Sequence, residues 1–205
     1  MVISPVMGKG LNLNVLGGWH APPDAAASRF LEGLKAHEKL LLFSEGSMTL
    51  ELELLTGKRV DVELKMRGER ALSIEEAEFL GVDPRSGALE REVWLVAGQT
   101  KLLYARTLIP ANCISGEVRS ALDEKSSEPL GRVLSSMGIL FAKERLEAGI
   151  VRCEAASLDL GLSVESTFYA RRYILYNKGA GGWVIKAAVA EVFSPALVGP
   201  LGAAR

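Results

Sequence analysis

The chain has 205 residues, of which 24% are charged, and its formal net charge is −1. This length suits a single domain, spanning residues 1–205, with a sizeable buried core. The near-neutral charge argues against a nucleic-acid partner, because nucleic acids are usually bound by a basic face. No stretch reaches the ~18 apolar residues of a membrane span. We therefore expect neither a nucleic-acid nor a membrane partner.

The two cysteines, Cys113 and Cys153, have a separation that fits no zinc-binding motif. A domain of this size does not need a disulfide to be stable. We therefore expect two free thiols, no metal site, and a cytoplasmic location, where thiols stay reduced.

The first 40 residues are predicted to form an N-terminal arm and a helix. Residues 1–25 are rich in Gly, Pro and Asn, which favours an extended arm or loop. They contain no continuous apolar core of signal-peptide length. In residues 25–37, the apolar side chains of Phe30, Leu31 and Leu34 recur at helical spacing, which indicates an amphipathic helix.

The clearest local pattern lies in residues 48–66, MTLELELLTGKRVDVELKM. Apolar and charged residues alternate on both sides of the segment TGKR. Alternation with a period of two is typical of strands, and the glycine suits a turn between them. The pattern predicts an antiparallel hairpin whose acidic side chains form a solvated face and not a metal site.

The later elements are helices and paired strands. The segment SIEE matches a capping box and predicts a short helix over residues 73–79. Residues 89–96 and 101–109 flank AGQT and predict a second, more buried hairpin. Two helices are expected over residues 115–125 and 129–137, and three strands over residues 140–151, 166–176 and 183–193. This series is typical of an α+β fold with a largely antiparallel sheet.

Two charged residues interrupt apolar strands. Arg91 begins REVWLV, where an arginine is costly unless it is paired, and composition alone favours a carboxylate partner at a sheet edge. Glu191 falls on the otherwise apolar face of its strand, so its burial is expected. Glu191 could be the structural partner of Arg171 or Arg172, or it could take part in chemistry. The pattern alone favours neither role.

Four collinear segments carry a family resemblance: residues 41–49 (LLFSEGSMT), 91–110 (REVWLVAGQTKLLYARTLIP), 128–132 (EPLGR) and 190–195 (AEVFSP). Together they resemble chorismate lyase, which splits chorismate into 4-hydroxybenzoate and pyruvate. The resemblance implies an α+β fold in which helices pack on an antiparallel sheet of about six strands and enclose the ligand. It also implies a lyase that uses no metal or organic cofactor and takes chorismate as its small-molecule substrate.

The resemblance assigns catalytic roles to Arg91 and Glu191. Arg91 matches an arginine that clamps the ligand, and a guanidinium fork suits a carboxylate. Glu191 matches a glutamate that faces the phenolic end of the product. There it can orient the ring hydroxyl or accept a proton.

Met48, Leu130 and Arg106 are expected to bind substrate as well. Met48, where a loop enters the first predicted strand, and Leu130, at a helix start, would use their backbone amides. Arg106, in YARTLIP, would bind the enolpyruvyl carboxylate or guard access. Of the doublet Arg171-Arg172, at most one side chain can reach the pocket, because successive strand residues point to opposite faces.

A second function is a small-molecule binding domain without catalysis, related to the effector domains of bacterial transcription regulators. These have a similar fold, but they follow a winged helix-turn-helix of ~60 or more residues. The segment before Leu41 is shorter than that. The presence of both Arg91 and Glu191 favours the lyase.

Overall fold

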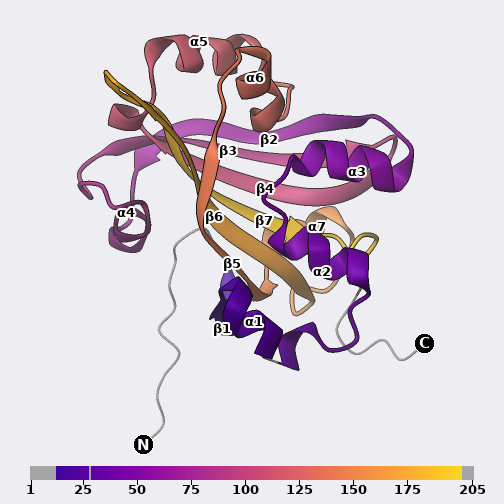
Figure 1. Ribbon diagram of the computed structural model, residues 1–205. Coiled ribbons are helices and arrows are strands. Elements are labelled where there is room, and N and C mark those ends of the chain that lie inside the picture. Colours follow the sequence, from indigo (N-terminus) through magenta and orange to yellow (C-terminus); the bar gives the residue numbers. More distant parts are fainter. Residues whose placement is uncertain (1–12, 28, 200–205) are drawn as a thin grey trace, which may run out of the picture.

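Seven antiparallel strands form one sheet in the computed structural model, which describes residues 13–27 and 29–199 (Figure 1). The strand order is β1-β5-β6-β7-β4-β3-β2. The expected α+β class and antiparallel sheet are confirmed. The sheet has one strand more than the expected six, because β1 (Asn14–His20) pairs with β5. This strand lies where an extended arm was predicted, and the part of that arm before residue 13 lies outside the described residues.

The other six strands run through the rest of the chain: β2 (Val60–Ala71), β3 (Gly87–Ala97), β4 (Thr100–Pro110), β5 (Ala142–Arg152), β6 (Thr167–Gly179) and β7 (Gly182–Phe193). The second predicted hairpin is confirmed as β3–β4, and the three C-terminal strands are confirmed as β5, β6 and β7. In the β3–β4 turn, Gly98 has φ +64°, which a glycine adopts without steric cost.

The first strand of the hairpin predicted over residues 48–66 is wrong, because Met48–Thr56 forms helix α3. Ser47 caps this helix by accepting a hydrogen bond from the Leu50 amide, and Gly57 ends it at φ +65°. Leu and Glu are strong helix formers, and Met48 and Leu52 bury one helical face at i, i+4 spacing. The same residues are therefore compatible with a helix as well as a strand, and packing of the helix against the sheet favours the helix.

The predicted helix over residues 25–37 is divided. The structure has α1 (Pro22–Ala27), a 3-10 turn at Arg29–Leu31, and α2 (Ala36–Phe43). Gly33 lies between them at φ +81°, a left-handed value that interrupts a right-handed helix. Phe30, Leu31 and Leu34 still pack against the core, so their apolar spacing was correct and the continuous helix was not.

The remaining helices follow the predictions except for one. The capping box is present, since Ser73 accepts a hydrogen bond from the Glu76 amide at the start of α4 (Ile74–Leu80). Two later helices, α5 (Gly116–Glu124) and α6 (Leu130–Ser136), are confirmed. Helix α7 (Glu154–Asp159) was not predicted.

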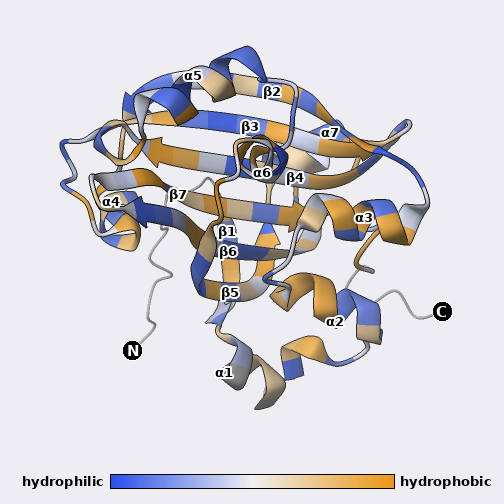
Figure 2. Cartoon of the chain, turned by 45° about the horizontal axis from the view of Figure 1, so that its top comes forward, coloured by the Kyte–Doolittle hydropathy of each residue, from blue (hydrophilic) through white to orange (hydrophobic). Residues whose placement is uncertain are grey.

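Each face of the sheet is covered by its own helices. Helices α2, α3, α5 and α6 pack on one face, whereas α4 and α7 pack on the other. Figure 1 shows α3 and α6 above the central strands, and Figure 2 shows a hydrophilic segment within β3, where most of the strand is buried. The candidate site lies on the face that is covered by α2, α3, α5 and α6.

Cys113 and Cys153 are both free, as predicted, and both are buried. Among the described residues, no helix is long and apolar enough to cross a membrane. The same residues contain no cluster of His, Cys, Asp and Glu that could hold a metal ion.

Candidate active site

A cavity lies between the central strands and the first turns of α3 and α6. Its sheet wall consists of Arg91, Val93, Leu95, Ala105, Thr107, Lys143, Tyr173, Leu175, Val189 and Glu191. Its other wall consists of Gly46, Ser47, Met48, Thr49, Pro129, Leu130, Gly131 and Phe141. The structure thus brings together four of the five predicted site residues.

Met48 and Leu130 are each the first residue of a helix, α3 and α6. The first amides of a helix have no partner within it and attract anions. Met48 was predicted to lie where a loop enters a strand. Its position at the start of a helix instead leaves its backbone amide without a helical partner, which favours the expected role of that amide in anion binding. The two helices are braced by Arg132 of α6, whose Nη2 lies 2.8 Å from Glu53 Oε1 of α3.

Arg91 is a buried cation that faces the cavity. The residue is 7% exposed, and its Nη2 donates to the carbonyls of Ser126 (2.7 Å) and Glu128 (2.8 Å). Its Nε has no hydrogen-bond partner among the described residues, and no ion pair within that part of the chain includes Arg91. The edge ion pair that composition favours is therefore absent from the described residues. Burial, together with the neighbouring charge of Arg67, lowers the pKa of Arg91 to about 10, so it remains protonated at neutral pH.

Glu191 lies in the cavity wall and is also paired from behind. Arg171 Nε donates to its Oε2 at 2.5 Å, and the Tyr173 hydroxyl donates to its Oε1 at 3.2 Å. Arg171 is fully buried and also donates to the carbonyls of Leu41 and Ser44. The structural partner considered for Glu191 is therefore Arg171, and this pairing leaves Glu191 in contact with the cavity.

The two residues beside this pair have distinct positions. Burial, followed by the charge of Glu191, raises the pKa of Tyr173 well above its usual value, so its hydroxyl stays neutral and can donate. Arg172 points to the other face, where it pairs with Glu147 at 2.7 Å and lies over the Trp19 ring. Alternation predicted that at most one arginine of the doublet reaches the cavity. Arg171 lies on the cavity side of the sheet behind Glu191, and neither arginine lines the cavity.

Lys143 was missed by the sequence analysis. Its Nζ donates to the Gly46 carbonyl at 2.8 Å, lies 3.4 Å from the Ser44 carbonyl, and sits 4.9 Å from the centre of the Tyr173 ring. Burial, followed by the charge of Arg171, lowers its pKa. In the sequence, Lys143 belongs to the charged segment AKERLE, which looks like a solvated strand, so no local signal separated it from its neighbours.

Arg106 does not line the cavity. Its neighbours Ala105 and Thr107 face the cavity from β4, so Arg106 points to the opposite face. There it pairs with Glu90 and, at 3.3 Å, with Glu92. This position gives no support to the expected contact between Arg106 and the enolpyruvyl carboxylate.

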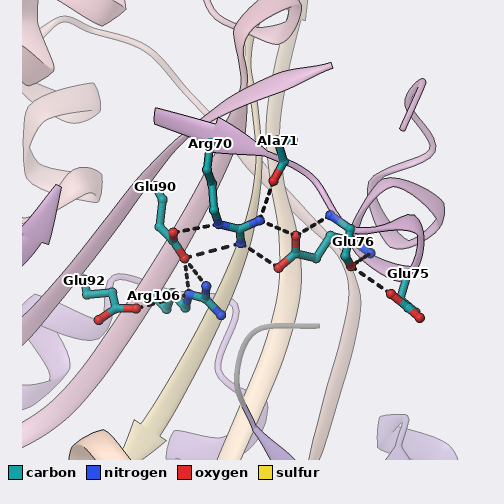
Figure 3. A network of polar contacts seen from close by, with 8 residues as sticks. Arg70, Ala71, Glu75, Glu76, Glu90, Glu92 and Arg106 are labelled. Atoms are coloured by element: carbon teal, nitrogen blue, oxygen red, sulfur yellow. Dashed lines mark hydrogen bonds and ion pairs between the residues drawn. The ribbon is translucent and has the colours of Figure 1, made fainter. Parts of the chain in front are cut away.

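Figure 3 shows the polar network that holds Arg106. Arg70 lies at its centre and donates to Glu76 and to Glu90, with Nε 2.7 Å from Glu90 Oε2. The Glu76 side chain also completes the capping box of α4 by accepting a hydrogen bond from the Ser73 amide, so the network joins β2, β3 and β4 to that helix. Its role in the described structure is to connect these elements.

We expect Arg106→Met to destabilise the fold by about 3 kcal/mol, the lower end of the range for breaking a buried ion pair, because Arg70 still contacts Glu90. Ligand affinity of the folded protein should stay unchanged. Chemical denaturation and titration with 4-hydroxybenzoate measure the two quantities. A large loss of ligand affinity in a variant that keeps its folding stability would contradict this prediction and support a role for Arg106 in ligand binding.

The fold and cavity define a class: an α+β protein with a cavity between one face of an antiparallel sheet and the N-termini of two helices. The family model described as "Chorismate pyruvate-lyase Rv2949c-like" matches residues 42–199, well over half of the chain. The chain therefore belongs to this family, and the resemblance drawn from its motifs is confirmed.

Two bacterial relatives carry the name "Probable chorismate pyruvate-lyase". The protein of Pseudomonas aeruginosa (strain UCBPP-PA14) is 31% identical over 160 residues, which is 76% of this chain and 82% of the relative. The protein of Marinobacter nauticus (strain ATCC 700491 / DSM 11845 / VT8) is 33% identical over 132 residues, which is 64% of this chain and 68% of the relative.

Among solved structures, PhnF from Mycobacterium smegmatis is similar, with a TM-score of 0.57 and 18% identity. The match covers 76% of this chain but only 66% of PhnF, slightly less than two thirds. The separate effector domain of PhnF matches with a TM-score of 0.54 and 16% identity, covering 72% of this chain and 88% of the domain. At these identities the likeness shows the shared fold alone.

Proposed function

We propose that the protein is a chorismate pyruvate-lyase, which eliminates pyruvate from chorismate to give 4-hydroxybenzoate. The observation that carries this proposal is the cavity itself. It combines Glu191 with a buried Arg91 that forms no ion pair among the described residues, in a chain that belongs to the lyase family. A cavity lined by a buried guanidinium is suited to an anion, because a carboxylate offsets the cost of burying the cation.

In the proposed complex, Arg91 binds the ring carboxylate, helped by the backbone amides of Met48 and Leu130. Glu191 accepts a hydrogen bond from the ring hydroxyl. Arg171 and Tyr173 hold the Glu191 carboxylate in place through their hydrogen bonds. The ligand is thus oriented by both ends, which is the main requirement of a reaction that needs one reactive conformer.

The elimination balances without a redox partner. The ring carbon that bears the hydroxyl loses a proton, and the electron pair of that C–H bond completes the aromatic ring. The ether C–O bond breaks, and its electrons leave with the enolate of pyruvate, which takes up a proton. Among the described residues that line the cavity, Glu191 is the sole carboxylate, so it is the group available to carry this proton.

We expect the purified protein to convert chorismate into equal amounts of 4-hydroxybenzoate and pyruvate, with full activity in excess chelator. Chromatography of the aromatic product and a coupled assay of pyruvate measure both. Arg85→Ala, at a 90% exposed side chain in a turn, is a matched control that should keep full activity. Loss of activity with chelator, or release of no pyruvate, would contradict the proposal.

The second candidate, binding without catalysis, is favoured by the likeness to the PhnF effector domain. Tight binding of chorismate without product formation would support it. We also propose a cytoplasmic location, since two free, buried cysteines suit a reducing compartment.

A further inference from the structure

The cavity holds more positive charge than one carboxylate requires. Arg91 and Lys143 both line it, and neither forms an ion pair within the described part of the chain. Glu191, the one carboxylate among the described lining residues, is already paired with Arg171. Arg91 and Lys143 therefore remain as two cations without a matched anion.

The two cations enter the cavity from opposite sides. Arg91 lies on β3 and bonds to carbonyls just before α6, whereas Lys143 lies on β5 and bonds to carbonyls just before α3. Four inter-strand steps separate β3 from β5 in the sheet order, which amounts to roughly 19 Å between their backbones at the usual strand spacing. A ligand between these side chains can contact both, one at each end.

Lys143 has a donor to spare. An ammonium group carries three N–H donors. Gly46 accepts one at 2.8 Å, and Ser44 accepts a second at a longer 3.4 Å. Glu191, Glu51 and Glu45 act on the charge of Lys143 from a distance, and none of them forms an ion pair with it; Glu51 also bonds to Ser44.

We propose that Lys143 forms a second carboxylate subsite, so that the cavity selects dicarboxylates in which Arg91 and Lys143 each bind one carboxylate. This inference rests on the proposed function in one respect, because chorismate is such a dianion. Its ring carboxylate would lie at Arg91 and its enolpyruvyl carboxylate at Lys143. In this proposal Lys143, and not Arg106 as expected from the sequence, binds the enolpyruvyl carboxylate.

The subsite has a consequence for turnover. Before elimination, the ligand contacts both cations. After it, the second carboxylate belongs to pyruvate, and 4-hydroxybenzoate keeps the contact with Arg91 alone. Lys143 therefore favours substrate over aromatic product in the same cavity.

A purely structural role for Lys143 makes a different prediction. If Lys143 only tethers the loop of residues 44–47, its removal displaces the start of α3 and weakens every ligand equally. If it binds the second carboxylate, its removal weakens dicarboxylates selectively. The comparison of two ligands on one variant therefore separates the roles.

The test uses two unreactive probes, 4-hydroxybenzoate and 3-(carboxymethoxy)-4-hydroxybenzoate, titrated calorimetrically into the full chain. We expect Lys143→Gln to lose roughly 30-fold in affinity for the dicarboxylate, the low end of losing one partner of a buried charge pair. Affinity for 4-hydroxybenzoate should change by less than about threefold. This ligand has no second carboxylate, so replacing Lys143 removes none of its hydrogen bonds. Lys143→Arg should restore much of the selectivity, and Lys178→Gln, at an exposed lysine of β6, should change neither affinity.

Equal losses for both probes in Lys143→Gln would show a tether and overturn the subsite, as would unchanged affinity for both. This outcome is independent of catalysis. If the wild-type protein released no pyruvate, but Lys143→Gln lost selectivity for the dicarboxylate, the proposed function would fail and the subsite would stand. If the wild-type protein released pyruvate, but selectivity did not depend on Lys143, the subsite would fail and the proposed function would stand.

Discussion

Arg91→Ala is expected to weaken the binding of 4-hydroxybenzoate by about 2–5 kcal/mol, the range for truncating one partner of a buried, hydrogen-bonded charge pair. Arg91 is buried and forms no ion pair with any described residue, and its lowered pKa reflects the cost of that burial. A bound carboxylate offsets this cost, so the guanidinium contributes most when the ligand is present. Arg91→Lys should recover only part of the loss, because an ammonium cannot present two parallel donors.

Thermal melts separate binding from folding in this variant. A ligand that binds only the folded state raises the melting temperature of the wild-type protein. In Arg91→Ala this rise should nearly vanish, while the melt without ligand should move little, since the lost bonds to Ser126 and Glu128 are offset by removal of a buried charge. Affinity close to that of the wild type in Arg91→Ala would make it a structural arginine.

Glu191→Gln is expected to reduce turnover strongly and also to cost about 3–5 kcal/mol of folding stability, the scale for breaking a buried ion pair. The stability effect follows from Arg171, which is fully buried and would lose its carboxylate partner. Amide and carboxyl groups have similar volumes, so packing is preserved while the charge is lost. Single-turnover rates and chemical denaturation on the same variant give the two quantities.

The double variant Arg171→Met with Glu191→Gln distinguishes the two roles of Glu191. Replacing both members of a buried pair leaves no stranded charge, so most of the folding stability should return. Turnover should not return, because the cavity still lacks its carboxylate. Recovery of both stability and turnover would show that Glu191 serves the fold and not the reaction.

The local elements that the sequence predicted well have signals within a few residues. The capping box at Ser73, the β3–β4 hairpin with its Gly98 turn, and the three C-terminal strands all depend on neighbouring residues. The failures also have a local origin. Residues 48–56 satisfy both a strand pattern and a helix pattern, and burial of Met48 and Leu52 against the sheet decides between them.

The candidate site divides in the same way. The sequence by itself determined the family, the antiparallel α+β class and four residues of the cavity, Met48, Arg91, Leu130 and Glu191, because these residues lie in short motifs that resemble those of the family. Tertiary structure decided which charges face each other. A strand register places each side chain on one face or the other, and residues far apart in the chain become neighbours only when the sheet forms.

Three side chains depend on that register. Arg106 turns away from the cavity to meet Glu90, Arg171 comes to lie directly opposite Glu191, and Lys143 enters the cavity from β5. No local pattern could reveal these positions, because each depends on a partner strand whose pairing is set by packing of the whole sheet. The residue types that carry the proposed chemistry are written in the sequence, and their pairing is a property of the fold.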